Sequence, residues 1–195
     1  MTPLLELFLA STWGYLLGSV PTGVLVCRVM RAPDPRQEGS GHTGGLNVGR
    51  SAGFLGGALT TVVDFLLGAG AVTAALLLTG NPWAATAAGA MAVAGHNWSV
   101  FLRFEGGIGL STLLGAMLAF APLTAAGAFL VLLSLWLVMV KLLRIHRARA
   151  TIVAMVAVGP VLWLLGMPWP GVVMGALGAL VVIVKTLPDW TRKYD

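Results

Sequence analysis

Seven long apolar stretches, separated by short polar breaks, constrain this chain more than any other feature. They cover residues 4–27, 54–79, 83–101, 109–122, 123–143, 151–167 and 170–187. A helix needs about 20 predominantly apolar residues to cross a bilayer, and the stretches lack the two-residue alternation of membrane β-strands. The pattern predicts an all-α integral membrane protein with seven transmembrane helices.

Composition supports this fold class and excludes a soluble enzyme. Only 10% of the residues are charged, against about 25% in ordinary soluble domains, and the mean hydropathy is +0.89. Twelve Lys and Arg residues and seven Asp and Glu residues cannot cover the surface of a soluble chain of 195 residues. We therefore expect one polytopic membrane domain over 1–195, with no sizeable domain outside the membrane.

The candidate metal ligands are too few and too scattered to predict a metal site. A single cysteine, Cys27, and three histidines far apart in the chain lack the spacing of a ligand set. One cysteine also excludes an internal disulfide. We expect no metal, no cofactor and no nucleic-acid partner, and the sequence indicates no particular oligomeric state.

Two of the seven stretches leave the number of crossings open. The fourth, 109–122, is short, and the third, 83–101, carries His96 and Asn97 before its end. These two stretches are either full spans or a short or re-entrant pair. Seven and five crossings both place the chain ends on opposite sides of the membrane, so charge alone does not separate the two models.

The basic residues all fall on one side of such a membrane protein. They follow the first, third and fifth stretches and flank or follow the seventh: Arg28, Arg31, Arg36, Arg50, Arg103, Lys141, Arg144, Arg147, Arg149, Lys185, Arg192 and Lys193. Positively charged loops are retained in the cytoplasm. The N-terminus is therefore predicted to lie outside and the C-terminus in the cytoplasm, in the cell inner (plasma) membrane.

A glycine-rich segment, 38–50, lies on the predicted cytoplasmic side. Its five glycines let the backbone fold tightly and turn N–H groups inward, which makes a nest suited to an anion. Ser40 adds a hydroxyl donor, and Arg50 adds a planar cation whose donors match a phosphate. The segment is either an anion site or a flexible linker. As an anion site, its candidate residues are Gly39, Ser40, Gly41, Gly44, Asn47 and Arg50.

A second glycine cluster follows the third stretch on the same side. His96 precedes it, and its candidate anion-binding residues are Gly106, Gly107 and Gly109. His96 is either a base or hydrogen-bond donor of a site, or the cap of a helix end. Two polar glycine loops in one compartment predict a shared cleft into which Arg50 and His96 both point.

Asp64 is the one carboxylate well inside an apolar stretch. A charged group at that depth is expensive and normally has a partner, and Arg50, His96 and Asn97 are the candidates. A purely structural hydrogen bond between helices is the alternative.

These loops resemble the bacterial acyl-phosphate:glycerol-3-phosphate acyltransferase family, known as PlsY. The segment 18–23 is similar to the family's GS(I/V)PxG, and Asp64 and Gly68 are similar to its DxxKG. Its GSGNxGATNxxR is matched at Gly39, Ser40, Gly41, Gly44, Asn47 and Arg50. Its GHxxPxFxxFKGGKGxAT is matched at Gly95, His96, Phe101, Phe104, Gly106, Gly107, Gly109 and Thr112.

The resemblance implies a reaction and roles for these residues. The family moves a fatty acyl group from acyl phosphate to the 1-hydroxyl of glycerol 3-phosphate, which gives lysophosphatidate in phospholipid biosynthesis. His96 and Ser40 would be catalytic, and Arg50, Asn47 and the glycines of both loops would hold phosphate. Acyl phosphate, glycerol 3-phosphate and membrane lipids are the implied partners.

Several positions depart from the family's motifs. His42 replaces an Asn, Leu67 and Ile108 replace lysines, and Glu105 places a negative charge where the family has a positive one. Glu105 should then be turned away or paired with a cation such as Arg103. If the site is rebuilt, Arg147, Arg149 and Lys185 are the candidates for compensating charge. We expect at least one of Arg147 and Arg149 to point into the same cleft as Arg50.

The alternative to a rebuilt site is a catalytically weak or inactive family member that acts as a lipid-binding or regulatory membrane protein. A transporter would also fit glycine-broken spans around Asp64, but the loop motifs do not support that class.

Overall fold

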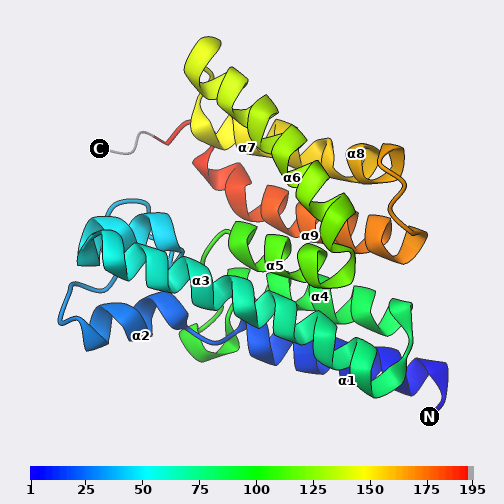
Figure 1. The fold of residues 1–195 in the computed structure, drawn as a ribbon. Helices are drawn as coiled ribbons and strands as arrows, with labels where there is room; N and C mark the ends of the chain where they lie inside the picture. Colours follow the sequence, from blue (N-terminus) through cyan, green and yellow to red (C-terminus); the bar gives the residue numbers. More distant parts are fainter. Residues whose placement is uncertain (193–195) are drawn as a thin grey trace.

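The computed structural model describes residues 1–192, and this part of the chain contains helices and no β-strand. The α-helices are α1 (Pro3–Gly18), α2 (Thr22–Val29), α3 (Gly45–Thr79), α4 (Pro82–Asn97), α5 (Leu110–Phe120), α6 (Pro122–Leu137), α7 (Arg147–Val156), α8 (Val158–Leu164) and α9 (Trp169–Thr186). Two short 3₁₀-helices, η1 (Val100–Leu102) and η3 (Leu187–Asp189), and a short π-helix, η2 (Val138–Leu142), complete it. Figure 1 shows α1 to α5 as the lower part of the molecule and α6 to α9 as the upper part.

Each predicted apolar stretch is helical, but the helices differ in length. Four helical runs are long and apolar enough to cross a membrane: Pro3–Val29, Gly45–Thr79, Pro122–Leu142 and Trp169–Asp189. The pair α7 and α8, bent by 42°, makes a fifth if it counts as one span. The third and fourth stretches form α4 and α5, which have 16 and 11 residues. They are the short pair that the sequence allowed, and seven full crossings stay a prediction.

Proline and glycine mark where these helices begin and end. Proline lies in the first turn of α1, α4, α6 and α9, where its missing N–H costs nothing. At Asn81 the side chain accepts a hydrogen bond from the backbone N–H of Trp83 and caps α4. Gly80, with φ of 63°, ends α3 in the left-handed conformation that glycine adopts freely.

Small residues build the middle of the molecule, where α4 packs against α1, α3 and α9. Gly14 and Gly18 of α1 lie against the backbone carbonyls of Ala88 and Ala92 of α4, so closely that a Cβ at either glycine would collide with them. Alanines dominate the buried face of α4. Such close backbone approach is how helices associate without bulky interdigitating side chains.

The start of α3 is a tight helical hairpin. At Gly53 the chain reverses with φ of 76°, so residues 45–52 fold back on the turns that follow, with Gly45 against Thr61 and Gly49 against Gly57. The doubled cyan ribbon at the left of Figure 1 is this hairpin. The sequence placed the helix start at 54, because the polar residues of 45–52 hid a helical turn. Phe54, 90% exposed, projects from the bend.

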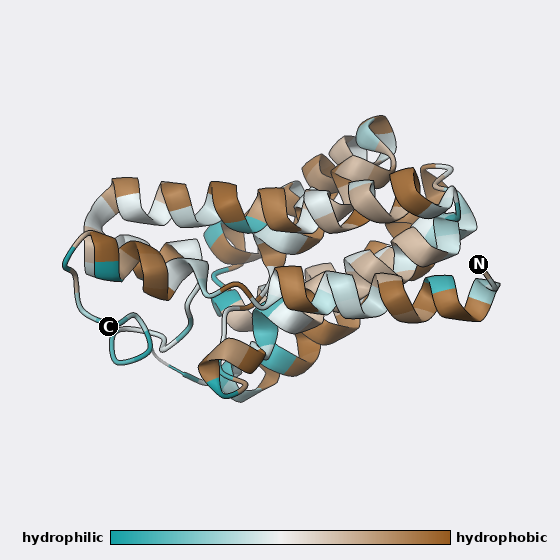
Figure 2. Cartoon of the chain, turned by 90° about the horizontal axis from the view of Figure 1, so that it is seen from below, coloured by the Kyte–Doolittle hydropathy of each residue, from teal (hydrophilic) through white to brown (hydrophobic). Residues whose placement is uncertain are grey.

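The polar segments gather at the end of the bundle opposite the N-terminus. Figure 1 shows the loop before α3 and the end of α9 at the left, while α1 begins at the lower right. Figure 2 shows brown residues along the helices and teal ones mainly in the connecting segments. The polar loops therefore share one end of an otherwise apolar bundle.

Candidate functional site

A cleft of about 250 Å³ opens at this polar end. Three separate segments line it, and their residues are Arg36, Ser40, Gly41, His42, Phe104, Glu105, Gly106, Lys185 and Arg192. Arg36 Nη1 lies 2.9 Å from Glu105 Oε2, which joins the first loop directly to the second. The expected proximity of the two glycine loops is therefore what the structure shows.

Asn47 organises the first loop from the start of α3. Its Oδ1 accepts the N–H of Ser40 at 3.0 Å, and its Nδ2 donates to the carbonyls of Pro35, Glu38 and His42. Gly39 passes so close to this amide, with φ of 51°, that a side chain there would meet Oδ1. Asn47 thus shapes the loop that presents Ser40, and its predicted contact with phosphate stays a prediction.

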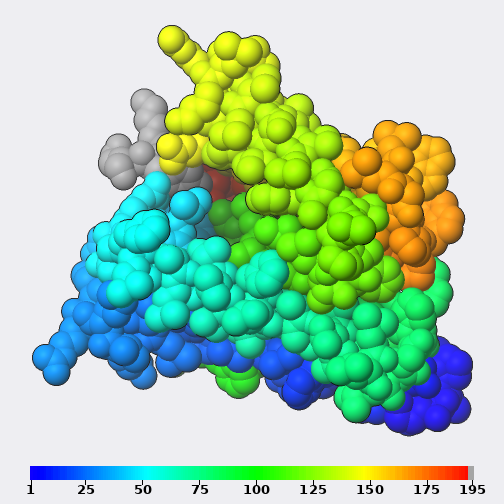
Figure 3. Space-filling view, viewed as in Figure 1, coloured from blue at the N-terminus to red at the C-terminus, as the bar shows by residue number. Residues whose placement is uncertain are grey.

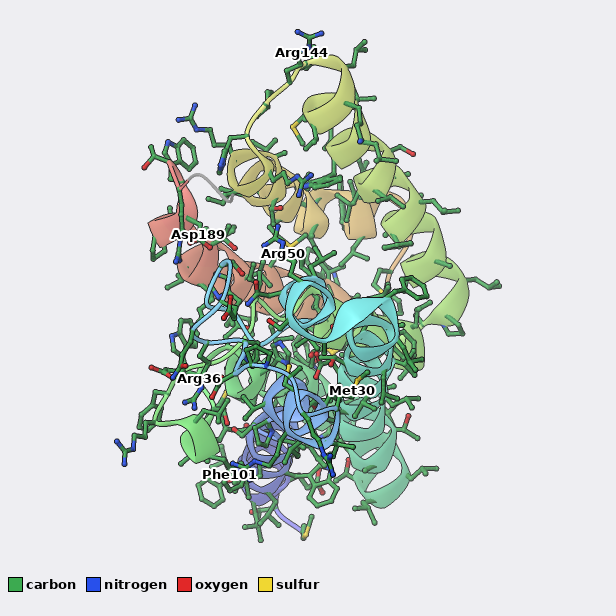
Figure 4. The ribbon with its side chains drawn as sticks, turned by 90° about the vertical axis from the view of Figure 1, so that its left-hand side faces the viewer. Met30, Arg36, Arg50, Phe101, Arg144 and Asp189 are labelled. Atoms are coloured by element: carbon green, nitrogen blue, oxygen red, sulfur yellow. The ribbon has the colours of Figure 1, made fainter. Side chains whose placement is uncertain are left out.

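Arg50 lies next to this loop and not among the residues that line the cleft. Its side chain is exposed, and its Cδ and Nη1 lie 3.4 Å from where a Cβ on Gly39 would be. Figure 4 shows it extending from the start of α3, away from Arg36. Gly44, just before α3, has open space around it. The predicted meeting of Arg50 with His96 in one cleft stays untested.

The second loop wraps around the end of α4. The backbone N–H of Gly107 donates to the carbonyl of His96 at 3.0 Å, and a Cβ at Gly106 or Gly107 would collide with His96. Gly109, with φ of 86°, turns the chain into α5. Gly106 and Gly107 are therefore required by their contact with His96. The loop leads to a helix N-terminus, whose N–H groups favour anions.

Arg36 is engaged by two carboxylates. Besides Glu105, it binds Asp34 at 2.7 Å. Hydrogen bonding to Arg36 holds the pKa of Asp34 below its usual value, and the same contacts raise the pKa of Arg36. Glu105 is thus neutralised by Arg36 and not by Arg103, the partner that the sequence suggested. Arg36 lies 69 residues away in the chain, and the fold brings it to Glu105.

His42 and Asp189 fasten the first loop to the end of α9. Nε2 of His42 lies 2.6 Å from Oδ2 of Asp189, and Arg192 lies 3.4 Å from the other oxygen of that buried carboxylate. The sequence reasoning missed this contact. The departure of His42 from the family motif marked it as a residue with a different contact. Its partner could not be identified, because Asp189 is 147 residues away in the chain.

Lys185, on the last turns of α9, is one of the three cations that the sequence offered as compensating charge. It lines the cleft, and its Nζ lies 5.7 Å from the centre of the Trp98 ring. The nearby carboxylates, Glu105 and Asp189, are already paired with other cations. Within residues 1–192, Lys185 makes no ion pair.

The two arginines expected to compensate lie elsewhere. Arg149 donates from Nε to the carbonyl of Trp190 at 3.3 Å and lies over its ring. Arg147 begins α7 and is exposed. Neither of them lines the cleft, whereas Lys185 does. Lys193 lies outside the described residues.

Asp64 faces His96 across the α3–α4 contact. Its Oδ1 lies 3.6 Å from Nδ1 of His96, and the two residues are 1% and 7% exposed. Of the three partners that the sequence allowed, the structure selects His96.

The structure is a helical membrane bundle with a cleft at its polar end. Cations, two glycine loops and a histidine form this cleft. Such a site defines a class of membrane protein that acts on phosphate compounds. Comparison with known proteins identifies the family. A family model described as glycerol-3-phosphate acyltransferase matches residues 8–193. The chain belongs to the glycerol-3-phosphate acyltransferase family.

Relatives and solved structures agree with this assignment. Glycerol-3-phosphate acyltransferase from Rubrobacter xylanophilus is 42% identical over 87% of this chain and 82% of its own length. Glycerol-3-phosphate acyltransferase 2 from Moorella thermoacetica is 39% identical over 94% of this chain and 92% of its own. The crystal structure of PlsY (YgiH), an integral membrane glycerol 3-phosphate acyltransferase, in its glycerol 3-phosphate form has a TM-score of 0.81 and 30% identity, covering 95% of this chain and 90% of that one.

Family membership confirms the predicted class of enzyme. The chain is an enzyme of acyl transfer to glycerol 3-phosphate in a membrane, consistent with phospholipid biosynthesis. An inactive scaffold and a transporter are not favoured.

Proposed function

We propose that this protein transfers a fatty acyl group from acyl phosphate to the 1-hydroxyl of glycerol 3-phosphate, releasing lysophosphatidate and inorganic phosphate. The cleft carries this proposal, because it places cations and glycine loops for phosphate at the end of an apolar bundle. Both substrates carry phosphate, and only the donor and product carry a long apolar chain.

The phosphate groups would be held by side chains and backbone together. Lys185 is the cation of the cleft without an ion pair among the described residues, and a charge-assisted hydrogen bond to phosphate contributes roughly 1.5–3 kcal/mol. Ser40 adds a hydroxyl, and Gly39, Gly41, Gly44, Gly106, Gly107 and Gly109 allow backbone N–H groups to approach. Arg50, at the edge of the first loop, would neutralise charge as the substrate enters.

His96 and Ser40 are the proposed catalytic residues. As the 1-hydroxyl oxygen bonds to the acyl carbonyl carbon, Nε2 of His96 accepts the hydroxyl proton. The bond from the acyl carbon to the phosphate oxygen then breaks, and the proton passes to the departing phosphate. Ser40 would donate a hydrogen bond to the oxyanion that forms on the carbonyl.

The acyl chain would lie between helices, in contact with membrane lipid. Figure 3 shows the surface hollowed between the start of α3 and α6, with red α9 beneath. We place the cleft on the cytoplasmic side of the inner membrane, with the N-terminus outside and seven crossings of one domain, because all Lys and Arg residues then face the cytoplasm.

Incubation of the purified protein with acyl phosphate and glycerol 3-phosphate tests the proposal. We expect lysophosphatidate and phosphate in equal amounts. Arg50→Ala should lower kcat/KM at least tenfold, about 1.4 kcal/mol. Arg144→Ala is the matched control, because Figure 4 shows Arg144 at the far tip of the molecule. A wild type without turnover on any acyl phosphate would overturn the function.

A further inference from the structure

The polar side chains that line the cleft, within the described part of the chain, are mostly hydrogen-bond donors. Arg36, Lys185 and Arg192 can only donate, and Glu105 is already bound to Arg36 at 2.9 Å. Glycerol 3-phosphate brings two kinds of group to such a cleft: a phosphate, which accepts hydrogen bonds, and hydroxyls, each of which also has a proton to donate. A hydroxyl that enters the cleft therefore needs an acceptor that the cations do not provide.

His42 lines the cleft and is held there at one ring nitrogen. Its Nε2 lies 2.6 Å from Oδ2 of Asp189, a carboxylate whose side chain is 2% exposed. Arg192 lies 3.4 Å from the other oxygen of that carboxylate. Because an ionised carboxylate can only accept, the proton of the neutral imidazole lies on Nε2. Nδ1 of His42 then keeps its lone pair.

This second ring nitrogen has not been taken up by the fold. Within residues 1–192, Nδ1 of His42 makes no hydrogen bond, and 14% of the side chain is exposed. The backbone N–H of His42 donates to Oγ of Ser40 at 3.4 Å. The acceptor therefore belongs to a residue that is bonded directly to Ser40, the proposed donor to the carbonyl oxyanion.

The two hydroxyls of the substrate place different demands on an acceptor. The 1-hydroxyl loses its proton when the acyl group is attached. The 2-hydroxyl keeps its proton throughout, so it needs a group that holds a hydrogen bond without removing the proton. It also lies on the carbon between the phosphate-bearing end and the reacting end. With phosphate on Lys185 and the reacting carbonyl at Ser40, His42 is the lining residue suited to this middle hydroxyl.

We propose that Nδ1 of His42 accepts a hydrogen bond from the 2-hydroxyl of glycerol 3-phosphate and so selects this substrate over phosphates that lack that hydroxyl. His42 is then a substrate-binding residue, and Asp189, which fixes the tautomer, is its positioning residue. The inference rests on the proposed function for the identity of the substrate, but it does not depend on which group takes the proton of the 1-hydroxyl. It also gives a role to a residue that departs from the family motif.

A substrate that lacks only the 2-hydroxyl, 3-hydroxypropyl phosphate, provides the first test. We expect the wild type to use glycerol 3-phosphate at least tenfold better by kcat/KM, because the analogue leaves Nδ1 unpaired. His42→Leu should reduce this preference to less than twofold, mainly by raising KM for glycerol 3-phosphate. His42→Asn, whose amide oxygen can accept, should keep part of it.

His146→Leu is the matched control, because it makes the same change at a histidine outside the cleft lining. It should keep the full preference. A wild type that uses the two substrates equally well, or a His42→Leu variant whose preference equals that of the wild type, would overturn the inference.

Calorimetric binding without an acyl donor separates this inference from the proposed function. The wild type should bind glycerol 3-phosphate at least tenfold more tightly than 3-hydroxypropyl phosphate. That preference in a protein without turnover on any acyl phosphate would overturn the proposed function and leave the inference standing. Turnover together with equal binding of the two compounds would do the reverse.

Nitrogen-15 NMR of histidine-labelled protein tests the role of Asp189. The His42 signals are assigned by their loss in His42→Asn. We expect the proton on Nε2 in the wild type, and a mixture of both tautomers in Asp189→Ala with at least a threefold smaller substrate preference. A wild type with the proton on Nδ1 would overturn the inference without any variant. An unchanged tautomer and preference in Asp189→Ala would overturn the positioning role.

Discussion

The packed middle of the bundle and its polar end obey different rules. Between α1 and α4, glycines contact backbone carbonyls, and one added methyl group has nowhere to go. At the cleft, charged side chains on long flexible stems meet across loops, and residue types differ from the family motifs without loss of the fold. Shape therefore constrains the middle, whereas the charged side chains of the cleft are constrained by their summed charge and their reach.

The cause of this difference is the reach of each interaction. Backbone contact acts over a fraction of an ångström in a close-packed interior, so it ties one residue to one partner. A cation can serve a phosphate from several attachment points, so Lys185 on α9 can stand in for lysines missing from the loop before α5. The following predictions probe that contrast.

The largest effect is expected from Gly18→Ala in the packed middle. The new Cβ would meet the carbonyl of Ala92, and overpacking of this kind costs about 1–3 kcal/mol. Thermal unfolding in detergent should show a lower Tm. Gly70→Ala is the matched control, because nothing lies within 4 Å of an added Cβ there. Equal Tm values for the two variants would contradict the shape rule.

Lys185→Gln should give the largest effect at the polar end. Loss of the cation without an ion pair should raise KM for glycerol 3-phosphate about tenfold, on the scale of 1.4 kcal/mol, with Tm unchanged. Steady-state kinetics measures it, and the exposed Lys141→Gln serves as control. If KM stays at the wild-type value, another group binds the phosphate.

Glu105→Lys should act in the opposite direction and more weakly. It removes the negative charge of the cleft and restores the residue type of the family motif. Glu105 is partly exposed, its side chain being 61% accessible, so the gain is limited to roughly 0.2–1 kcal/mol. We expect KM to fall about threefold, with no fall in Glu38→Lys, where the same charge change lies outside the cleft lining.

The smallest effect concerns acid stability. Hydrogen bonding to Arg36 lowers the pKa of Asp34 below its unfolded value, so this carboxylate stabilises the fold above its unfolded pKa. That contribution is lost as pH falls through the lowered pKa. The Tm difference between wild type and Asp34→Asn should therefore shrink as pH falls from 6 towards 3. A difference that stays constant over this range would show that the ion pair contributes nothing to stability.

The sequence was sufficient to predict the membrane class and the positions of the two glycine loops. Its apolar stretches correspond to helices, and the glycines of 39–44 and 106–109 lie where the motifs placed them. Hydropathy and glycine spacing are local properties, so they can be read along the chain. The helix start at 45 was missed because the reversal at Gly53 depends on contacts between Gly49 and Gly57.

The charge network at the cleft was beyond sequence reasoning, for a physical reason. Glu105 with Arg36, His42 with Asp189 and Lys185 beside Trp98 each join residues far apart in the chain. A charged side chain has no periodicity that identifies its partner. Arg149 and Lys185 were therefore equally good candidates for the cation of the cleft until the helices were placed. Sequence alone determined that this chain is a helical membrane protein with two glycine loops. Only the tertiary structure decided which cation faces the cleft, and that His96 and not Arg50 or Asn97 forms the ion-pair contact with the buried Asp64, because both depend on how α3, α4 and α9 pack.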